Sequence, residues 1–177
     1  MNKILIVVDM QNDFVTGALR NEEGIKIVPA VVKRLEKAVS DGEKIIFTRD
    51  THFDNYMETE EGRNLPVPHC IKGTEGWEII PELKRFTDGA DIYDKPVFGS
   101  LKLGEDLAEE TDENTVIELI GLCTDICVIS NAVIARAARP DAHIIVDASC
   151  CAGVTPESHK TALNAMKTFQ VEIVNED

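Results

Sequence analysis

The sequence predicts an α/β fold of three layers, in which helices cover both faces of a doubly wound, six-stranded, mainly parallel sheet. Two observations support this prediction. Short runs rich in Ile, Val and Leu alternate with longer segments whose apolar residues recur at helical spacing, and this alternation is typical of βαβ units. The first run, residues 3–10, is almost entirely apolar, as expected of a strand buried on both faces. We therefore expect the Rossmann-like strand order 3-2-1-4-5-6.

The elements follow one another along a chain whose length of 177 residues suits one domain, residues 1–177. The last helix has a clear start, since Thr155 can cap it and Pro156 suits its first position. Strands are expected at residues 3–10, 44–48, 91–95, 115–120, 143–147 and 171–174. Helices are expected at residues 27–40, 100–110, 124–139 and 155–169, with a short one at 77–86.

Composition excludes several classes of partner. The formal net charge of −14 argues against nucleic acids and anionic membranes, which require clustered Lys and Arg. No apolar run approaches the roughly 20 residues of a membrane span, and the first residues lead directly into a strand rather than a signal peptide. The five cysteines lack paired CxxC spacing, which favours a reduced, cytoplasmic protein over a disulfide framework or a cysteine-based zinc site.

A cysteine follows the fourth predicted strand at a place suited to a nucleophile. The strand should stop at Gly121 and a helix should begin near Thr124, so Cys127 falls in or beside the first turn of that helix. Unpaired N–H groups and the helix dipole favour a thiolate there. The alternative is that Cys127 is a small buried hydrophobic residue.

Two further polar residues should reach the same edge of the sheet as Cys127. Asp9 lies at the carboxyl end of the first strand and Lys95 at that of the third, and ligands of such sheets bind beyond the carboxyl ends of the strands. A thiol, a carboxylate to take its proton and a cation form a workable acyl-transfer site. Taken singly, Asp9 could instead cap a turn with Gln11-Asn12-Asp13, and Lys95 could be a surface lysine.

A long loop, residues 51–77, follows the second strand, and loops of this length are usually functional. Asp50 and His52 stand two apart, so an extended chain would point both side chains the same way. His69 could close onto them and Glu61 could add a fourth ligand, giving a site for a divalent transition metal. The alternative is two ordinary loop histidines.

These residues belong to motifs that resemble the isochorismatase-like cysteine hydrolases and, within them, the nicotinamidases. The resemblance covers almost the whole chain. The motifs are Val8-Asp9-Met10-Gln11-Asn12-Asp13-Phe14, Thr48-Arg49-Asp50-Thr51-His52, His69-Cys70-Ile71-Lys72-Gly73-Thr74, Lys95-Pro96-Val97-Phe98-Gly99-Ser100 and Gly121-Leu122-Cys123-Thr124-Asp125-Ile126-Cys127-Val128.

The resemblance implies a catalytic triad of Asp9, Lys95 and Cys127. It also implies a cis peptide bond between Leu122 and Cys123, which would turn the Cys123 N–H towards the same oxyanion as the Cys127 N–H.

For the ligands, the resemblance implies that Asp50, His52 and His69 bind zinc, with manganese or iron as alternatives, and that Glu61 joins them in some members. Phe14 would flank the substrate ring, and we expect Phe98 to contact the substrate as well.

The chain departs from the family at two places in the expected pocket. It has Leu65-Pro66-Val67-Pro68 where many nicotinamidases carry an aromatic residue, and Ile126 where some have Tyr. Isochorismatases lack the nucleophilic cysteine, so Cys127 argues against vinyl-ether hydrolysis.

We therefore expect a metal-dependent amidase that converts nicotinamide to nicotinate and ammonia through a Cys127 thioester. It would act in the cytoplasm in NAD salvage, as a homo-oligomer and without an organic cofactor. The alternatives are the same chemistry on a carbamoyl or ureido compound without metal, and a non-catalytic ligand-binding protein. No GxGxxG follows the first strand and no GxxxxGK[ST] occurs, which disfavours a dinucleotide or phosphate binder.

Overall fold

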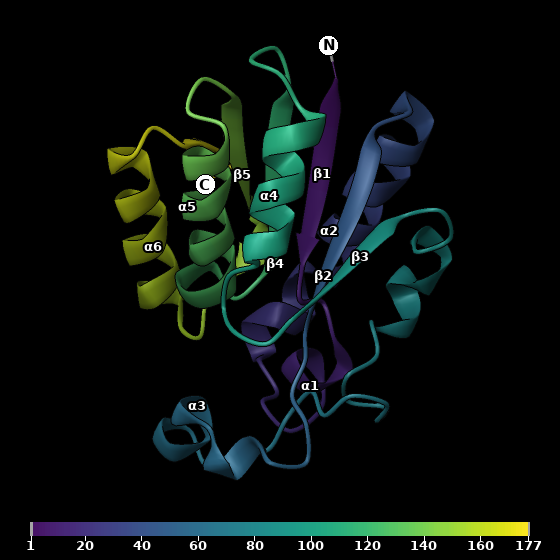
Figure 1. The fold of residues 1–177 in the computed structure, drawn as a ribbon. Coiled ribbons are helices and arrows are strands. Elements are labelled where there is room, and N and C mark those ends of the chain that lie inside the picture. The colour runs from purple at the N-terminus through teal and green to yellow at the C-terminus, as the bar shows by residue number, and fades with distance from the viewer. Residues whose placement is uncertain (1, 177) are drawn as a thin grey trace.

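The computed structural model describes residues 2–176 and contains a six-stranded sheet whose neighbouring strands all pair in parallel (Figure 1). The strand order is β3-β2-β1-β4-β5-β6, so the predicted order and fold class are confirmed. The strands are β1 (Lys3–Val8), β2 (Lys44–Asp50), β3 (Asp91–Lys95), β4 (Val116–Leu122), β5 (His143–Ala152) and β6 (Glu172–Val174).

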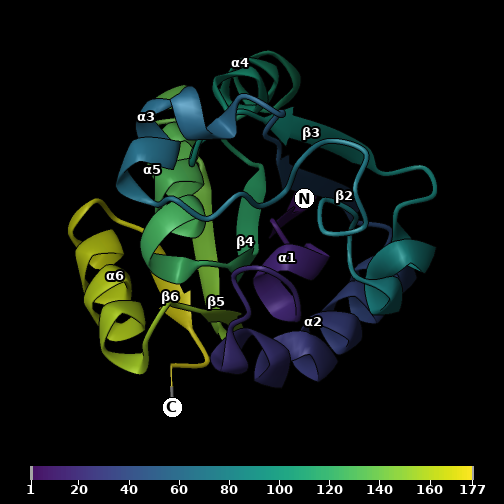
Figure 2. The same ribbon diagram turned by 90° about the horizontal axis from the view of Figure 1, so that it is seen from below.

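Helices cover both faces of this sheet. In Figure 1, α4, α5 and α6 lie in front of it and α2 lies behind. Figure 2 looks onto the edge where the strands end, and α1 and α3 lie over that edge. The α-helices are α1 (Asn12–Val15), α2 (Glu22–Asp41), α3 (Glu60–Asn64), α4 (Leu101–Glu110), α5 (Ile129–Ala138) and α6 (Pro156–Thr168). Tighter 3-10 turns form η1 (Tyr56–Glu58) and η2 (Pro81–Phe86), and η3 (Thr124–Val128) is a π-helical turn.

The two central strands are buried on both faces, as their apolar sequences predict. Every residue of β4 and all of β1 after Lys3 are buried. Because alternate side chains of a strand point to opposite faces, both helical layers pack against these two strands. The centre of the sheet is therefore rigidly held, and the polar residues that follow β1 and β4 start from fixed positions.

Several predicted boundaries were wrong. Helix α2 starts at Glu22 rather than residue 27, because the side chain of Asn21 caps it by accepting hydrogen bonds from the N–H groups of Glu23 and Gly24, and this first turn has no apolar periodicity. Strand β5 continues past residue 147 to Ala152. The segment predicted as a helix at 77–86 forms only the 3-10 turn η2.

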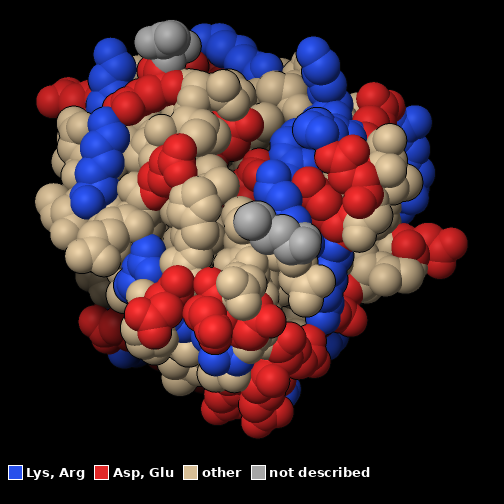
Figure 3. All heavy atoms as spheres, turned by 90° about the horizontal axis from the view of Figure 1, so that it is seen from above, with Lys and Arg blue, Asp and Glu red and all other residues tan. Residues whose placement is uncertain are grey.

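The amino-terminal edge of the sheet carries a buried ion network. Glu118 of β4 accepts two hydrogen bonds from Arg34 of α2, at 2.7 and 2.9 Å, and also pairs with Lys3 at 2.8 Å. Arg34 extends the network to Glu43 at 2.6 Å. Figure 3 views the molecule from this side, and acidic and basic side chains are interspersed on the face shown. The network ties α2 to the middle of the sheet.

We expect Glu118→Ala to lower the free energy of unfolding by about 3–5 kcal/mol, because it leaves the buried Arg34 short of a partner. Glu110→Ala, which breaks the exposed pair with Lys44, is the control and should cost less than about 1 kcal/mol. Urea denaturation of both variants measures the difference. Equal losses would show that the buried network adds no more than a surface pair.

None of the helices among residues 2–176 is both long and apolar enough to cross a bilayer. All five cysteines are free thiols, which agrees with the expectation that the chain has no disulfide framework.

Candidate active site

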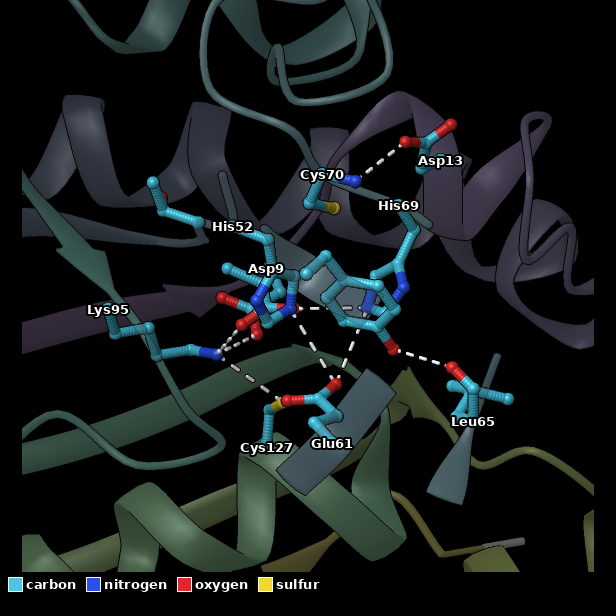
Figure 4. A network of polar contacts seen from close by, with 12 residues as sticks. Asp9, Asp13, His52, Glu61, Leu65, His69, Cys70, Lys95 and Cys127 are labelled. Atoms are coloured by element: carbon cyan, nitrogen blue, oxygen red, sulfur yellow. Dashed lines mark hydrogen bonds and ion pairs between the residues drawn. The ribbon is translucent and has the colours of Figure 1, made fainter. Parts of the chain in front are cut away.

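Four neighbouring strands bring polar side chains to one edge of the sheet. Asp9 follows β1, Asp50 ends β2, Lys95 ends β3, and Cys127 lies in the turn η3 after β4. In Figure 4 the side chains of Asp9, Lys95 and Cys127 converge from their separate elements, as the parallel order predicts. The structure thus brings the three residues of the predicted triad together beside one of the predicted metal ligands.

Lys95 is the centre of this group. Its Nζ lies 2.6 Å from Asp9 Oδ2, 3.3 Å from Asp50 Oδ1 and 3.5 Å from Cys127 Sγ. Only 1% of the residue is exposed, so the alternative of a surface lysine was wrong. Burial by itself would lower the pKa of Lys95, but the charges of Asp9, Cys127 and Asp50 outweigh it and hold the pKa above its ordinary value. The ammonium therefore remains charged.

Asp9 is fixed by its neighbour on β2. Thr48 Oγ1 donates a hydrogen bond to Asp9 Oδ1 at 2.6 Å, and the Asp9 N–H donates to the Thr48 carbonyl at 3.2 Å. Within residues 2–176 no donor makes a well-aligned hydrogen bond to Oδ2, although Lys95 is close to it. Complete burial raises the pKa of Asp9, and Lys95 offsets only part of this rise. A carboxylate with a raised pKa is suited to accept a proton from a neighbouring group.

The turn suggested for Asp9 also exists, but only in the backbone. The Gln11 N–H donates to the Asp9 carbonyl at 2.8 Å, while the carboxylate of Asp9 faces Lys95. The backbone at Asp9 has a φ of 47°, a left-handed conformation that is uncommon outside glycine. Turn formation and placement of the carboxylate in the site are thus compatible.

Cys127 lies in the π-helical turn η3, which begins at Thr124 and leads directly into α5, so its predicted place in or beside the first turn of a helix is confirmed. The net electrostatics differ from the expectation of a thiolate, because burial and the nearby Asp9 raise the pKa of the Cys127 thiol well above its ordinary value. A thiol in this environment needs a base to remove its proton, and Asp9 is placed to act as one.

The chain enters this turn through an unusual backbone. The peptide bond between Leu122 and Cys123 is cis, as the family resemblance implies. Just before it, Gly121 has a φ of 114°, and a Cβ there would come within 2.2 Å of the Val8 carbonyl oxygen. Only glycine lets β4 end this close to β1, so Gly121 brings the cysteine turn next to Asp9.

The four predicted metal ligands also lie together. Potential ligand atoms of Asp50, His52, Glu61 and His69 are all within 4.8 Å of one another. Asp50 Oδ2 lies 3.0 Å from His52 Nε2 and 3.4 Å from His69 Nε2, and Glu61 Oε1 lies 3.6 Å from each of those nitrogens. Glu61 reaches the cluster from α3, which folds over the edge of the sheet.

The chemistry of these donors fits a divalent cation. His69 Nδ1 lies 2.8 Å from the Val67 carbonyl oxygen, which turns Nε2 towards the cluster, a common arrangement of metal-binding histidines. Burial lowers the pKa of His52, but Asp50 and Glu61 reverse this and raise the pKa of His52 to about 9. Two carboxylates that attract a proton this strongly would equally attract a metal ion.

A cavity of about 70 Å³ lies between the two groups. Phe14 and Phe98, both predicted to contact the substrate, line it, and the Phe14 ring packs edge-on against His69 with 5.5 Å between ring centroids. The other lining residues are Leu19, Asp50, Glu61, Leu65, His69, Cys123, Ile126 and Cys127. A larger pocket of about 820 Å³ adjoins this cavity, and Phe14, Leu65 and Ile126 are among the residues that line both. A small planar molecule in the cavity would touch both groups.

Sequence reasoning missed three supporting residues. Thr48 was placed only as the end of a strand, because its bond to Asp9 depends on the register that sets Thr48 opposite Val8. Gln11 clamps the backbone of Asp50, donating to its carbonyl at 2.8 Å and accepting from its N–H at 2.7 Å. The ring of Tyr56 packs edge-on against both His52 and His69.

Comparison with known proteins agrees with this fold and site. The isochorismatase domain model matches residues 3–176. The nicotinamidase/pyrazinamidase of Mycobacterium tuberculosis is 29% identical over a gapped alignment of 188 residues, and this alignment covers 97% of this chain and 98% of that protein. The structure of pyrazinamidase from Pyrococcus horikoshii in complex with zinc aligns with a TM-score of 0.81 and 32% identity, covering 98% and 99% of the two chains. N-carbamoylsarcosine amidase from Thermoplasma acidophilum aligns with a TM-score of 0.80 and 26% identity, covering 100% and 98%.

The parallel sheet, the buried thiol at its carboxyl edge and these relatives together define an enzyme, a hydrolase of amide carbon–nitrogen bonds. More particularly, the chain belongs to the isochorismatase family.

Proposed function

We propose that this protein is a metal-dependent cysteine amidohydrolase that converts nicotinamide to nicotinate and ammonia, as a step of NAD salvage. One observation carries the proposal: Cys127, which lies against Lys95 and its partner Asp9, lines the same small cavity as three of the four possible metal ligands, Asp50, Glu61 and His69. The similarity to nicotinamidases supports the choice of substrate.

In the first half of the reaction, Cys127 is the nucleophile and Asp9 the base. Asp9 takes the thiol proton as sulfur attacks the carboxamide carbon, and the carbonyl oxygen becomes an oxyanion that the N–H groups of Cys123 and Cys127 stabilise. Removing one such donor typically costs about 3–4 kcal/mol of transition-state stabilisation. Asp9 then gives the proton to the amide nitrogen, the carbon–nitrogen bond breaks and ammonia leaves a thioester. Lys95 keeps the charges on sulfur and carboxylate balanced.

In the second half, water enters the position that ammonia leaves. Asp9 takes one proton from this water as its oxygen attacks the thioester carbon. The tetrahedral adduct then collapses, the carbon–sulfur bond breaks, and Asp9 returns the proton to the sulfur of Cys127. The second proton of the water stays on the product, which departs as the acid and loses that proton to solvent to give nicotinate, and the starting protonation of both groups is restored.

The residues that would hold the metal are Asp50, His52 and His69, with Glu61 as a fourth ligand. Zinc suits two imidazoles and carboxylates, and manganese or iron are the alternatives. When bound, the metal would supply a Lewis-acid anchor for the pyridine nitrogen of the substrate. The chain's own contribution is a rigid cavity in which Phe14 flanks the ring.

Ammonia release from a panel of amides, measured with and without a chelator, tests the proposal. We expect nicotinamide to be the preferred substrate and chelation to abolish its turnover. Hydrolysis of a carbamoyl or ureido compound that is insensitive to the chelator would favour the alternative, a metal-free amidase, which the similarity to N-carbamoylsarcosine amidase supports. A non-catalytic ligand-binding protein would release no ammonia from any member of the panel.

As the pH is lowered, we expect activity to be lost at a higher pH than it would be if the base were an aspartate with an ordinary pKa. The pKa of Asp9 is raised above its ordinary value by burial, and protonation of Asp9 removes the base. The base form is therefore present above the raised pKa and is lost as the pH falls through it. The pH profile of kcat/KM measures this limb. A limb at or below the ordinary aspartate pKa of about 4 would contradict the assignment of Asp9 as the base.

A further inference from the structure

Asn131 is a buried amide that touches both the nucleophile turn and a neighbouring loop. It lies on α5, one turn after Cys127, and 1% of it is exposed. Its Nδ2 donates to the Cys127 carbonyl at 2.8 Å and to the Phe98 carbonyl at 3.1 Å, and its Oδ1 accepts from the Ser100 N–H at 3.0 Å. Both ends of the carboxamide are therefore used.

This set of contacts requires a donor and an acceptor on one short side chain. A carboxamide offers two N–H donors and a carbonyl acceptor in one plane. Threonine at position 131 could still donate to the carbonyl four residues earlier, but it could not bridge to the loop. Aspartate would keep an acceptor for Ser100 and lose both donors. The contacts to the loop thus depend on asparagine in particular.

The loop that Asn131 holds, residues 96–100, joins β3 to α4 and carries a wall of the cavity. It starts immediately after Lys95 and includes Phe98, whose side chain lines the cavity and is 41% exposed. A Cβ on Gly99 would lie 2.5 Å from Ile134 Cδ1, so the loop rests directly on α5 at this point. Apolar contact with α5 alone would let the loop slide along the helix, whereas the hydrogen bonds of Asn131 hold the loop in one position.

We infer that Asn131 is a positioning residue that sets where Phe98 stands relative to Cys127, and therefore how well an aromatic amide fits the cavity. The inference rests on the proposed function, because it takes Cys127 as the nucleophile and Phe98 as a contact of the substrate ring. It makes Asn131 a determinant of substrate binding rather than of the chemical step.

The anchoring itself can be measured without a substrate. In Asn131→Thr, hydrogen exchange of the Ser100 amide should speed up about tenfold, because its acceptor is lost. In Asn131→Asp that acceptor remains, so the Ser100 amide should stay protected. Thr115→Val is the matched control, since it removes a buried hydroxyl that bonds Asp112 far from the site. Unchanged Ser100 exchange in Asn131→Thr would overturn the inference whatever the substrate.

The consequence for binding can be measured through the alkylation of Cys127 by iodoacetamide. We expect Asn131→Thr to alkylate within threefold of the wild-type rate, while the nicotinamide concentration that gives half protection, and the KM, rise about tenfold. Phe98→Ala should raise both to a similar extent, and the double variant should add little to Phe98→Ala, since coupled residues are not additive.

A positioning role for Asn131 differs measurably from a catalytic role and from a purely structural one. Additive effects in the double variant, or a fall in kcat with an unchanged KM, would overturn the inference. A loss of stability that Thr115→Val matches, with unchanged protection, would show that Asn131 is only structural. Failure of nicotinamide to protect the wild-type protein would contradict the proposed substrate, and Ser100 exchange would still decide whether Asn131 anchors the loop.

Discussion

Replacing Cys127 with alanine should reduce turnover by about 10⁴-fold or more, since removal of a nucleophile from a triad has effects of this size. Binding of nicotinamide should persist, because the ring contacts and the metal ligands come from other residues that line the cavity. Turnover is measured by ammonia release and binding by titration calorimetry on the metal-loaded protein.

Cys150→Ala is the matched control, since Cys150 is as deeply buried as Cys127 but lies on β5 and does not line the cavity. It should keep its activity. Residual hydrolysis in Cys127→Ala within tenfold of the wild-type rate would remove Cys127 from the role of nucleophile. Equal losses in both variants would point to a general effect of removing a buried thiol.

The sheet and the edge that carries the candidate site could be predicted from the sequence because both depend on the local pattern of apolar residues. Each strand appears as a run of apolar residues, and parallel order then places the residues at or just beyond the carboxyl ends of β1, β3 and β4 at one edge. Asp9, Lys95 and Cys127 lie there in the structure, with Lys95 in contact with both others. Topology, more than any single motif, located them.

The parts that could not be predicted depend on contacts between distant segments. The sign of the pKa shift at Cys127 follows from its burial, which a helical pattern does not reveal. The bond from Thr48 to Asp9 follows from strand register, and the contacts of Asn131 follow from the packing of the loop 96–100 on α5. Each of these residues looks ordinary within its own segment.

The cluster of possible metal ligands could be predicted from the sequence only in part. Asp50 and His52 could be paired because they stand two apart on an extended chain, and the structure joins them at 3.0 Å. Glu61 was placed only by the resemblance and by its position in the loop. Its approach depends on η1 and α3, where Thr59 caps the helix and the Tyr56 hydroxyl donates to the Leu65 carbonyl.

His52→Ala should weaken metal binding and nicotinamide binding together. The ligand atom of His52 lies between the two carboxylates, 3.0 Å from Asp50 and 3.6 Å from Glu61. Loss of even an outer-shell partner of a metal costs about 10–100-fold in affinity, so loss of this imidazole should cost more than about 100-fold. Metal content after dialysis, and calorimetry with zinc and with nicotinamide, measure the two affinities.

The joint loss is what distinguishes a metal anchor from a structural histidine. If the metal holds the substrate ring, nicotinamide affinity should fall in His52→Ala even though Phe14 still flanks the ring in this variant. His143→Ala is the control, since this exposed histidine pairs with Glu172 at the far edge of the sheet, and both affinities should be unchanged. A variant of His52 that loses metal but keeps nicotinamide affinity would favour the metal-free amidase, because substrate would then be held by the cavity wall alone.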